Sequence, residues 1–532
     1  MTTTTTLTPA LSAALDDLRT ALGPSVVLTG ADTAEFTDPY EPLSWGGQRS
    51  AAVVQPASTA EVQAVVRIAN THRVPLWVGS QGRNNGYGGS AAIVPGSIVV
   101  NLRRMDKVLE VNDELCYVVV EPGVSFNALY ERVQAEGKKV MIDVPDLGWG
   151  SVIGNTCDHG FGYTKYGDHF GSVCGIEVVL PTSEVLRTGM GGLEDNRAWH
   201  VYRSGFGPNP EGLFLQSNLG IITRMGVWVM PQPETYMDCQ IHIATSSALP
   251  PLINALRPLM IDGTIPNIPS FINTAGILSS MGPRSNFHPD PTTPIPESIL
   301  STIRAQTGIG AWMGRFALYG RPAQVAEAFS HIQSTLSPLG DITVTGQSHS
   351  PASLSQSSSL SQSTLVQAGI PTMSLLSSVS FAGSPGGHIG FSSILPLTSR
   401  DLTRLTAHLT AATQQASLDY TATITLTPRA LIHTFILFLH QSDTPSTEKA
   451  YAFCREMVAQ VAEMGYGEHR AHVSMMDLVA GQFSAGGHAQ RGFNERVKDT
   501  VDPEGVLMPG RAGIWGTAWR GRGVEMPWGR GV

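Results

Sequence analysis

Short apolar runs alternate with amphipathic stretches near the start of the chain. A β-branched run over 51–54 is followed by Ser58 and Glu61, which have the spacing of a helix capping box. Four apolar residues then recur at helical spacing over 62–69, and a second apolar run covers 74–78. This pattern predicts a strand, a helix and a second strand.

The same order of elements recurs further along the chain. An apolar run over 116–120 precedes a helical stripe over 126–133, and another run follows over 140–144. Two such βαβ-like units predict an α/β domain with cofactor loops at the ends of its strands. The runs 176–180 and 184–188 flank a Pro-Thr-Ser turn and predict a hairpin.

The composition changes near residue 230. Met-Pro-Gln-Pro occupies 230–233, prolines gather over 283–296, and serines dominate 348–363, for which we predict a mobile low-complexity loop. Turn signals such as Asp-Pro-Glu-Gly and Pro-Gly follow near the end of the chain. We therefore expect one domain built from residues 1–235 and 467–532, with a second domain over 236–466 between them.

Length and composition exclude several classes of protein. A chain of 532 residues is too long for one core, and a net charge of −9 argues against nucleic-acid binding. The five cysteines are scattered and never form C-x-x-C, so neither a disulfide framework nor a zinc site is expected. The N-terminus lacks the features of a secretory signal, no apolar run could span a bilayer, and the C-terminus is not the peroxisomal S-K-L. These features predict a cytoplasmic protein.

Two glycine-rich loops follow predicted strands. The first, GSQGRNNGYGG over 79–89, leaves backbone N–H groups free for an anion such as a diphosphate and presents the phenol of Tyr87. A plain glycine-rich turn is the alternative, because the loop matches neither common phosphate-binding pattern. The second, PDLGWGSVIGN over 145–155, is one residue longer than the dinucleotide pattern. The two loops are expected to line one long cleft.

Three polar positions are candidates for chemistry. Asp146 is either an Asx turn or a general base, and His388, between glycines, is either a core histidine or a group that a ligand can approach. His469 and His472 have the spacing of a metal pair, but no carboxylate or cysteine accompanies them, so no metal is predicted. Arg470 between them suits an anionic substrate, and a polar surface helix is the alternative.

A set of long motifs, taken together, resembles the vanillyl-alcohol oxidase family, in particular its 4-phenol oxidase (eugenol oxidase) branch. The motifs are GRNNGYGG (82–89), VPDLGWGSVIGN (144–155), GYTKYGDHF (162–170), LRTGMGGL (186–193), GFGPNPEGLFLQSNLGIIT (205–223), GGHIGFS (386–392), GYGEHRAH (465–472) and VDPEGVLMPGRAGIW (501–515). The resemblance implies a two-domain α+β or α/β protein. A discontinuous VAO/PCMH-type FAD-binding domain would carry an inserted cap domain, built on an antiparallel sheet flanked by helices.

The resemblance also implies a covalently bound FAD. His388 matches the histidine that bonds to the flavin 8α-methyl, and the attachment is monocovalent because the two loops lack the second histidine and cysteine of the bicovalent branch. The cofactor-binding set implied is Gly79, Ser80, Gly82, Arg83, Asn84, Gly86, Tyr87, Gly88, Gly89, Pro145, Asp146, Gly148, Ser151, Gly154, Asn155, Ile221, His388, Arg470 and Arg511.

Family chemistry implies oxidation of a para-substituted phenol or aromatic alcohol. Two tyrosines and an arginine hold the phenolate, an aspartate assists, and the benzylic carbon gives a hydride to flavin N5, leaving a quinone methide. Oxygen then reoxidises the flavin and forms hydrogen peroxide. Tyr87, Asp146 and Arg470 match three of these positions. Family precedent also implies a homodimer or larger homo-oligomer, with no nucleic-acid or membrane partner.

Two departures from the family pattern affect the substrate. His469 replaces a phenolate-binding tyrosine, and imidazole is a shorter donor that titrates near about 6.5 rather than 10. Losing a donor to a bound anion costs roughly 1.5–3 kcal/mol unless His469 substitutes for it. The second departure is Arg-Ala-Leu-Ile-His over 429–433, which predicts an altered substrate wall.

These departures leave other functions open. They include an oxidase of a bulkier or non-phenolic substrate, a dehydrogenase that passes electrons to a protein or quinone, and a flavin-binding protein with little catalysis.

Overall fold

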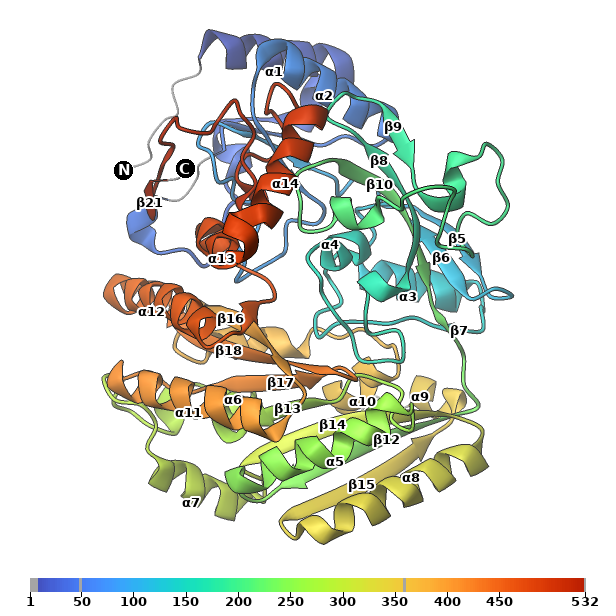
Figure 1. Ribbon diagram of the computed structural model, residues 1–532, viewed down its shortest axis with the longest axis vertical. Coiled ribbons are helices and arrows are strands. Elements are labelled where there is room, and N and C mark those ends of the chain that lie inside the picture. The colour runs from blue at the N-terminus through green and yellow to red at the C-terminus, as the bar shows by residue number, and fades with distance from the viewer. Residues whose placement is uncertain (1–7, 47–49, 357–359, 531–532) are drawn as a thin grey trace.

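The early and late parts of the chain build one half of the molecule, and the middle of the chain builds the other (Figure 1). The computed structural model describes residues 8–46, 50–356 and 360–530. In Figure 1 the half containing α1 and α14 lies above, and the half containing the large sheet lies below. We call them the upper and lower lobes.

The first sheet of the upper lobe contains the predicted βαβ unit. Its strand order is β1 (Val27–Leu28), β2 (Ala52–Val54), β4 (Ile98–Asn101) and β3 (Leu76–Gly79), and the last three strands are parallel. Helix α2 (Thr59–His72) links β2 to β3 and packs on α1 (Pro9–Leu22). The Ser58 hydroxyl accepts the Glu61 N–H at 3.2 Å, which confirms the predicted cap. The predicted apolar stripe of α2 is buried.

The second sheet of the upper lobe shows that the second predicted βαβ unit is wrong. Its strands, all antiparallel, are β5 (Val108–Asn112), β6 (Tyr117–Val120), β10 (Ile221–Trp228), β8 (Val173–Val179) and β9 (Val185–Arg187), in that order. Helix α3 (Phe126–Ala135) does follow β6, but the next strand, β7 (Val140–Met141), pairs with β11 (Met230–Pro231). Strands β5 and β10 already occupy both edges of β6. The predicted hairpin is confirmed as β8 and β9.

An eight-stranded antiparallel sheet spans the lower lobe. The order is β15 (Ile342–His349), β12 (Thr235–Ile243), β14 (Trp312–Gly320), β13 (Ser270–Asn273), β17 (Ala422–Leu426), β18 (Ala430–His440), β16 (Gly386–Pro396) and β19 (Gly467–Glu468). Together with the family relationship described below, this antiparallel sheet confirms the expected fold class. Helices α6 (Thr274–Met281), α7 (Glu297–Thr307) and α10 (Gln362–Gln367) lie in the connections between its strands.

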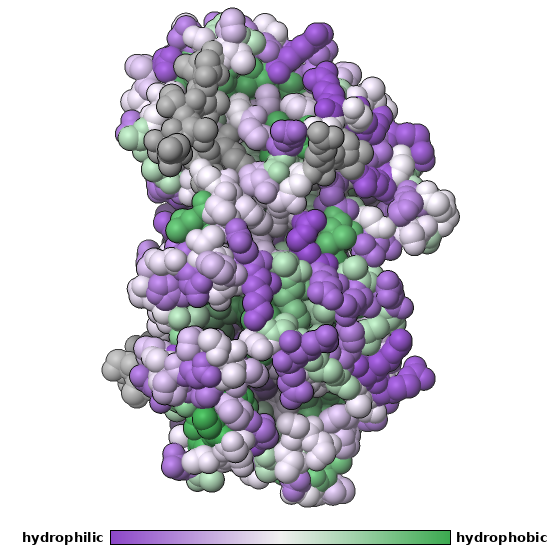
Figure 2. Space-filling view, turned by 90° about the vertical axis from the view of Figure 1, so that its left-hand side faces the viewer, coloured by the Kyte–Doolittle hydropathy of each residue, from purple (hydrophilic) through white to green (hydrophobic). Residues whose placement is uncertain are grey.

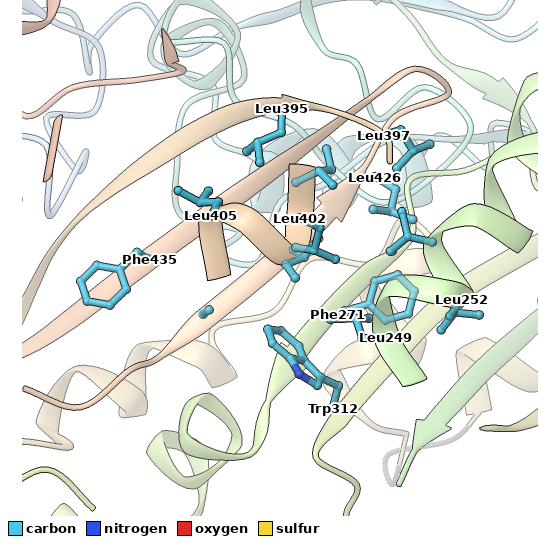
Figure 3. Close-up of a cluster of buried hydrophobic side chains, with 14 of the residues drawn as sticks. Leu249, Leu252, Phe271, Trp312, Leu395, Leu397, Leu402, Leu405, Leu426 and Phe435 are labelled. Carbon is cyan, nitrogen blue, oxygen red and sulfur yellow. The ribbon is translucent and has the colours of Figure 1, made fainter. Parts of the chain in front are cut away.

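Side chains alternate between the two faces of this sheet, as in any β-strand. On one face Phe271, Trp312 and Phe435 meet leucines of α5 (Leu249–Ile261) and α11 (Ser399–Gln415) in a buried cluster (Figure 3). Helices α8 (Pro322–Leu336) and α12 (Thr444–Glu463) extend the same core. The opposite face is left for the cavity described below.

The chain returns to the upper lobe through α13 (Met476–Gln482) and α14 (Ala485–Val501). The buried Lys498 ammonium donates to the carbonyls of Asn218 at 2.7 Å and Leu507 at 2.6 Å, and it pairs with Asp502 at 2.6 Å. Leu507 forms a parallel bridge with Leu76 of β3. These contacts join the late segment to the first sheet.

The serine-rich segment differs from the predicted loop. Part of it forms helix α9 (Pro351–Gln356), and its end starts α10, where the Ser361 hydroxyl accepts the N–H of Thr364 at 3.1 Å. Serine side chains favour helix N-caps, which the low-complexity interpretation did not consider. Residues 357–359 lie outside the described part of the chain.

Hydrophilic side chains spread over both lobes on the face shown in Figure 2, between smaller apolar areas. Among the described residues, no helix combines the length and apolar character needed to cross a membrane.

Candidate functional site

A cavity of about 460 Å³ lies among the two glycine-rich loops, the free face of the large sheet and the late segment. Most of the residues predicted from the sequence line it: Gly79, Ser80, Gly82, Arg83, Asn84, Tyr87, Gly89, Pro145, Asp146, Ser151, Gly154, Asn155, Ile221, His388, His469, Arg470 and Arg511. Gly86, Gly88 and Gly148 lie behind this lining, against His388, Val473 and Asn127 respectively. The fold therefore brings together residues that are more than 400 positions apart in the chain.

The first glycine loop needs its glycines. Gly82 and Gly86 have φ of 67° and 81°, where a side chain is strained. A Cβ on Gly86 would stand 2.5 Å from Nε2 of His388, and one on Gly82 would overlap the Ser90 hydroxyl. The backbone of this loop therefore packs so closely on His388 and Ser90 that no side chain fits at Gly86 or Gly82.

His388 projects from β16 into the cavity. Its ring centroid lies 5.2 Å from that of Tyr40, and the residue before it, Gly387, leaves room for the Tyr40 ring. Burial lowers the pKa of His388 to about 4, so the imidazole is neutral near pH 7. A neutral imidazole nitrogen with a lone pair is a nucleophile.

Asp146 is held by side chains that the sequence analysis did not identify. Tyr163 donates its hydroxyl to Oδ2, Arg315 of β14 donates to Oδ1 at 3.1 Å, and Gln362 donates to Oδ1 at 3.3 Å. The Arg315 guanidinium also lies 4.0 Å from the centre of the Tyr163 ring. Burial and the Asp146 charge raise the pKa of Tyr163, so its phenol stays protonated and donates. The carboxylate is a fixed negative charge rather than a free turn residue.

No sequence signal marked Arg315 or Gln362. Arg315 lies in the part of the chain without family motifs, and Gln362 lies in the serine-rich segment. Tyr163 does lie in the motif over 162–170 and could have been found from it.

Arg470 packs over the ring of Tyr87, and both residues line the cavity. Its guanidinium carbon lies 4.0 Å from the Tyr87 ring centre, and its Nε has no hydrogen-bond partner among the described residues. A buried cation with an unused N–H is suited to bind an anionic oxygen. We call Tyr87, His469 and Arg470 the clamp.

His469 is already engaged. Its Nε2 lies 2.8 Å from the His159 carbonyl oxygen, and its backbone N–H donates to the Ser392 carbonyl at 2.7 Å. Burial, and next the charge of Arg470, lower the pKa of His469 to about 4. The sequence left open whether this imidazole replaces the tyrosine donor. A neutral ring has one N–H, and in the structure that N–H donates to the His159 carbonyl rather than to the cavity.

Arg511 and Asn84 meet at Asp158, another residue that the sequence analysis missed. Arg511 pairs with one carboxylate oxygen, and the Asn84 side chain donates to the other at 2.6 Å. The ion pair connects the late segment to the first glycine loop.

The segment 429–433 does not form the wall of the cavity, so that prediction is wrong. Strand alternation turns His433 to the opposite face, where its Nε2 lies 2.7 Å from the Tyr420 hydroxyl. Strand β18 instead lines the cavity with Thr434, Ile436 and Phe438.

The two histidines of the H-x-x-H motif are also separate. His472 Nε2 lies 2.7 Å from a carboxylate oxygen of Asp38, and both side chains are buried. Within residues 8–46, 50–356 and 360–530, no cluster of three or more His, Cys, Asp or Glu side chains could hold a metal ion.

The cavity lining suits a cofactor with an anionic linker. Gly154 packs on Ser80 so tightly that a side chain would overlap, and the two glycine-rich loops and Arg83 belong to the lining.

Comparisons with known proteins agree with this geometry. A family model described as an FAD binding domain matches residues 50–189. The chain is 31% identical over 507 residues to the 4-cresol dehydrogenase [hydroxylating] flavoprotein subunit of Pseudomonas putida, covering 94% of this chain and 95% of that one. Its structure is similar to 4-ethylphenol oxidase from Gulosibacter chungangensis in its isoeugenol complex (TM-score 0.92, 33% identity, 97% and 99% of the chains). It is also similar to p-cresol methylhydroxylase with substrate bound (TM-score 0.89, 29% identity, 96% and 98%).

Proposed function

The chain belongs to the vanillyl-alcohol oxidase family of FAD-linked oxidoreductases, and from this premise we propose that it oxidises para-substituted phenols at the benzylic carbon. The three comparison proteins act on, or are named for, phenols of this class. The observation that supports the proposal best is the arrangement of Tyr87, Arg470 and Asp146 around one cavity.

The cofactor-binding residues fit FAD attached through His388. The loop over 79–89 and Gly154 would hold the diphosphate, with Arg83 and Arg511 offsetting its charge. His388 is neutral and lies in the cavity lining, where only a glycine leaves room beside its Nε2, so this nitrogen can bond to an electrophilic carbon. Bound FAD supplies the acceptor for the hydride and passes the electrons to oxygen, which gives hydrogen peroxide.

The side chains of the cavity divide the remaining work. Arg470 supplies positive charge, and Tyr87 supplies an O–H donor, to the phenol oxygen, so the substrate binds as phenolate. Asp146, fixed by Arg315 and Tyr163, places negative charge near the carbon that becomes electron-poor as its hydride leaves.

Anaerobic stopped-flow mixing tests the proposed function. The holoenzyme is mixed with 4-ethylphenol or with ethylbenzene, which has the same benzylic carbon without the phenol. We expect 4-ethylphenol alone to bleach the flavin absorbance near 450 nm. Failure of every 4-alkylphenol to bleach it would refute the proposal.

Attachment through His388 has its own test. After acid precipitation, yellow colour and flavin fluorescence should stay with the protein in the wild type and be lost to the supernatant in His388→Ala. Release of all flavin from the wild type would contradict the assignment.

A second candidate acceptor is a protein rather than oxygen, because the Pseudomonas putida relative is named as one subunit of a dehydrogenase. Peroxide formed per phenol oxidised separates the two. A ratio near one supports the oxidase, and a ratio near zero with slow reoxidation in air supports the dehydrogenase.

A further inference from the structure

His469 has a hydrogen-bonding role opposite to that of the other clamp residues. Its Nε2–H is used by the His159 carbonyl at 2.8 Å, which accepts and cannot donate. The ring is neutral near pH 7, because burial and the Arg470 charge lower its pKa to about 4. Its Nδ1 is therefore a lone-pair acceptor.

The Nδ1 atom of His469 is the ring nitrogen that the protein does not use. His469 belongs to the lining, and no partner for this nitrogen occurs in the described part of the chain. A lone pair here repels a phenolate oxygen, and it needs a hydrogen-bond donor from the ligand.

The sheet beside His469 presents hydroxyl groups to the same cavity. Ser392, Thr434 and Thr423 are direct register neighbours across β16, β18 and β17, and all three line the cavity. The Ser392 hydroxyl lies 3.3 Å from that of Thr434, and the Ser392 carbonyl accepts the His469 N–H. His469 therefore continues a polar row, which suits a ligand with a second polar group next to the clamped oxygen.

We propose that the preferred substrates are 4-substituted catechols, whose second hydroxyl, ortho to the oxygen held by Tyr87 and Arg470, donates to Nδ1 of His469. This inference rests on the proposed function and names its substrate class. An ortho-methoxy group has no hydrogen to donate, and a simple phenol leaves Nδ1 unpaired. The oxidation itself is unchanged: the benzylic C–H bond breaks, its hydride goes to the flavin, and the ring electrons form the quinone methide.

Three substrates with one benzylic carbon test the inference. Wild-type holoenzyme is mixed anaerobically with 4-ethylcatechol, 4-ethylphenol or 4-ethyl-2-methoxyphenol, and the Kd comes from the concentration dependence of flavin reduction. We expect a Kd about tenfold lower for the catechol than for the methoxyphenol, the usual effect of one hydrogen bond. Chromatography of the product must show oxidation at the side chain rather than an ortho-quinone.

Variants of His469 separate hydrogen bonding from packing. His469→Phe removes the acceptor and should abolish the catechol preference, so that the Kd values for 4-ethylcatechol and 4-ethyl-2-methoxyphenol become equal. His469→Gln can donate to His159 and accept from the substrate, so it should keep the preference. His331→Phe, an exposed histidine on α8, is the matched control.

The outcomes distinguish this inference from the function on which it rests. Bleaching by all three substrates with equal Kd, tighter binding of the methoxyphenol, or a preference that persists in His469→Phe would overturn the catechol assignment alone. No bleaching by any of the three would overturn the proposed function and this inference with it.

Discussion

Glu468 makes the stability of this protein depend on pH. Its carboxylate accepts the Ser392 N–H at 2.6 Å beside the clamp, and burial raises its pKa from an ordinary 4.5 to about 8. The folded state therefore keeps a proton that the unfolded chain releases above pH 4.5. Stability is complete below that pH and falls as the pH rises toward 8.

The magnitude follows from the shift. Each pH unit between 4.5 and 8 lowers the free energy of unfolding by up to about 1.4 kcal/mol, and the total loss is at most roughly 5 kcal/mol. Glu468→Gln is neutral at every pH and can still accept the Ser392 N–H through its side-chain carbonyl. The free energy of unfolding of this variant should equal that of the wild type within about 1 kcal/mol at pH 5 and exceed it by several kcal/mol at pH 8.

Urea unfolding of the holoenzyme at pH 5, 6.5 and 8 measures this difference. Glu463→Gln, an exposed glutamate at the end of α12, is the control and should follow the wild-type slope. Parallel pH dependences for Glu468→Gln and the wild type would show that Glu468 is ionised in the folded protein, and the reasoning would fail.

Two further variants test the construction of the cavity. Gly86→Ala places a Cβ 2.5 Å from His388 Nε2 and should reduce the amount of acid-stable flavin at least about tenfold. Gly96→Ala is the control, because Gly96 has a similar φ of 83° but open space around it, and it should keep its flavin. Equal flavin content in the two variants would show that the contact with His388 does not matter. Arg315→Met removes the ion pair to Asp146 and should slow flavin reduction by 4-ethylphenol about tenfold or more. Arg315→Lys should recover part of this rate. An unchanged rate constant in Arg315→Met would show that the ion pair does not assist the reaction.

Local features were predictable because neighbouring residues decide them. Ser58 and the stripe after it specify the cap and buried face of α2, and the glycine density over 79–89 specifies a loop with positive φ. The family motifs also placed His388 and Asp146 on the cavity wall.

Pairing between distant segments was not predictable in this way. The all-apolar strand β6 fits a parallel or an antiparallel sheet equally well, and its partners β5 and β10 settle the choice. His433 belongs to the segment 429–433, which was predicted to form the substrate wall. Strand alternation turns its side chain away from the cavity.

The sequence by itself determined the cofactor loops, the helix caps and the family, since these depend on residue types at short spacing. Only the tertiary structure decided that Arg315, 169 residues from Asp146, fixes its carboxylate, and that the His159 carbonyl accepts the hydrogen bond of His469. The physical reason is that a hydrogen bond belongs to the two groups that folding brings within about 3 Å, and spacing along the chain does not reveal which groups those are.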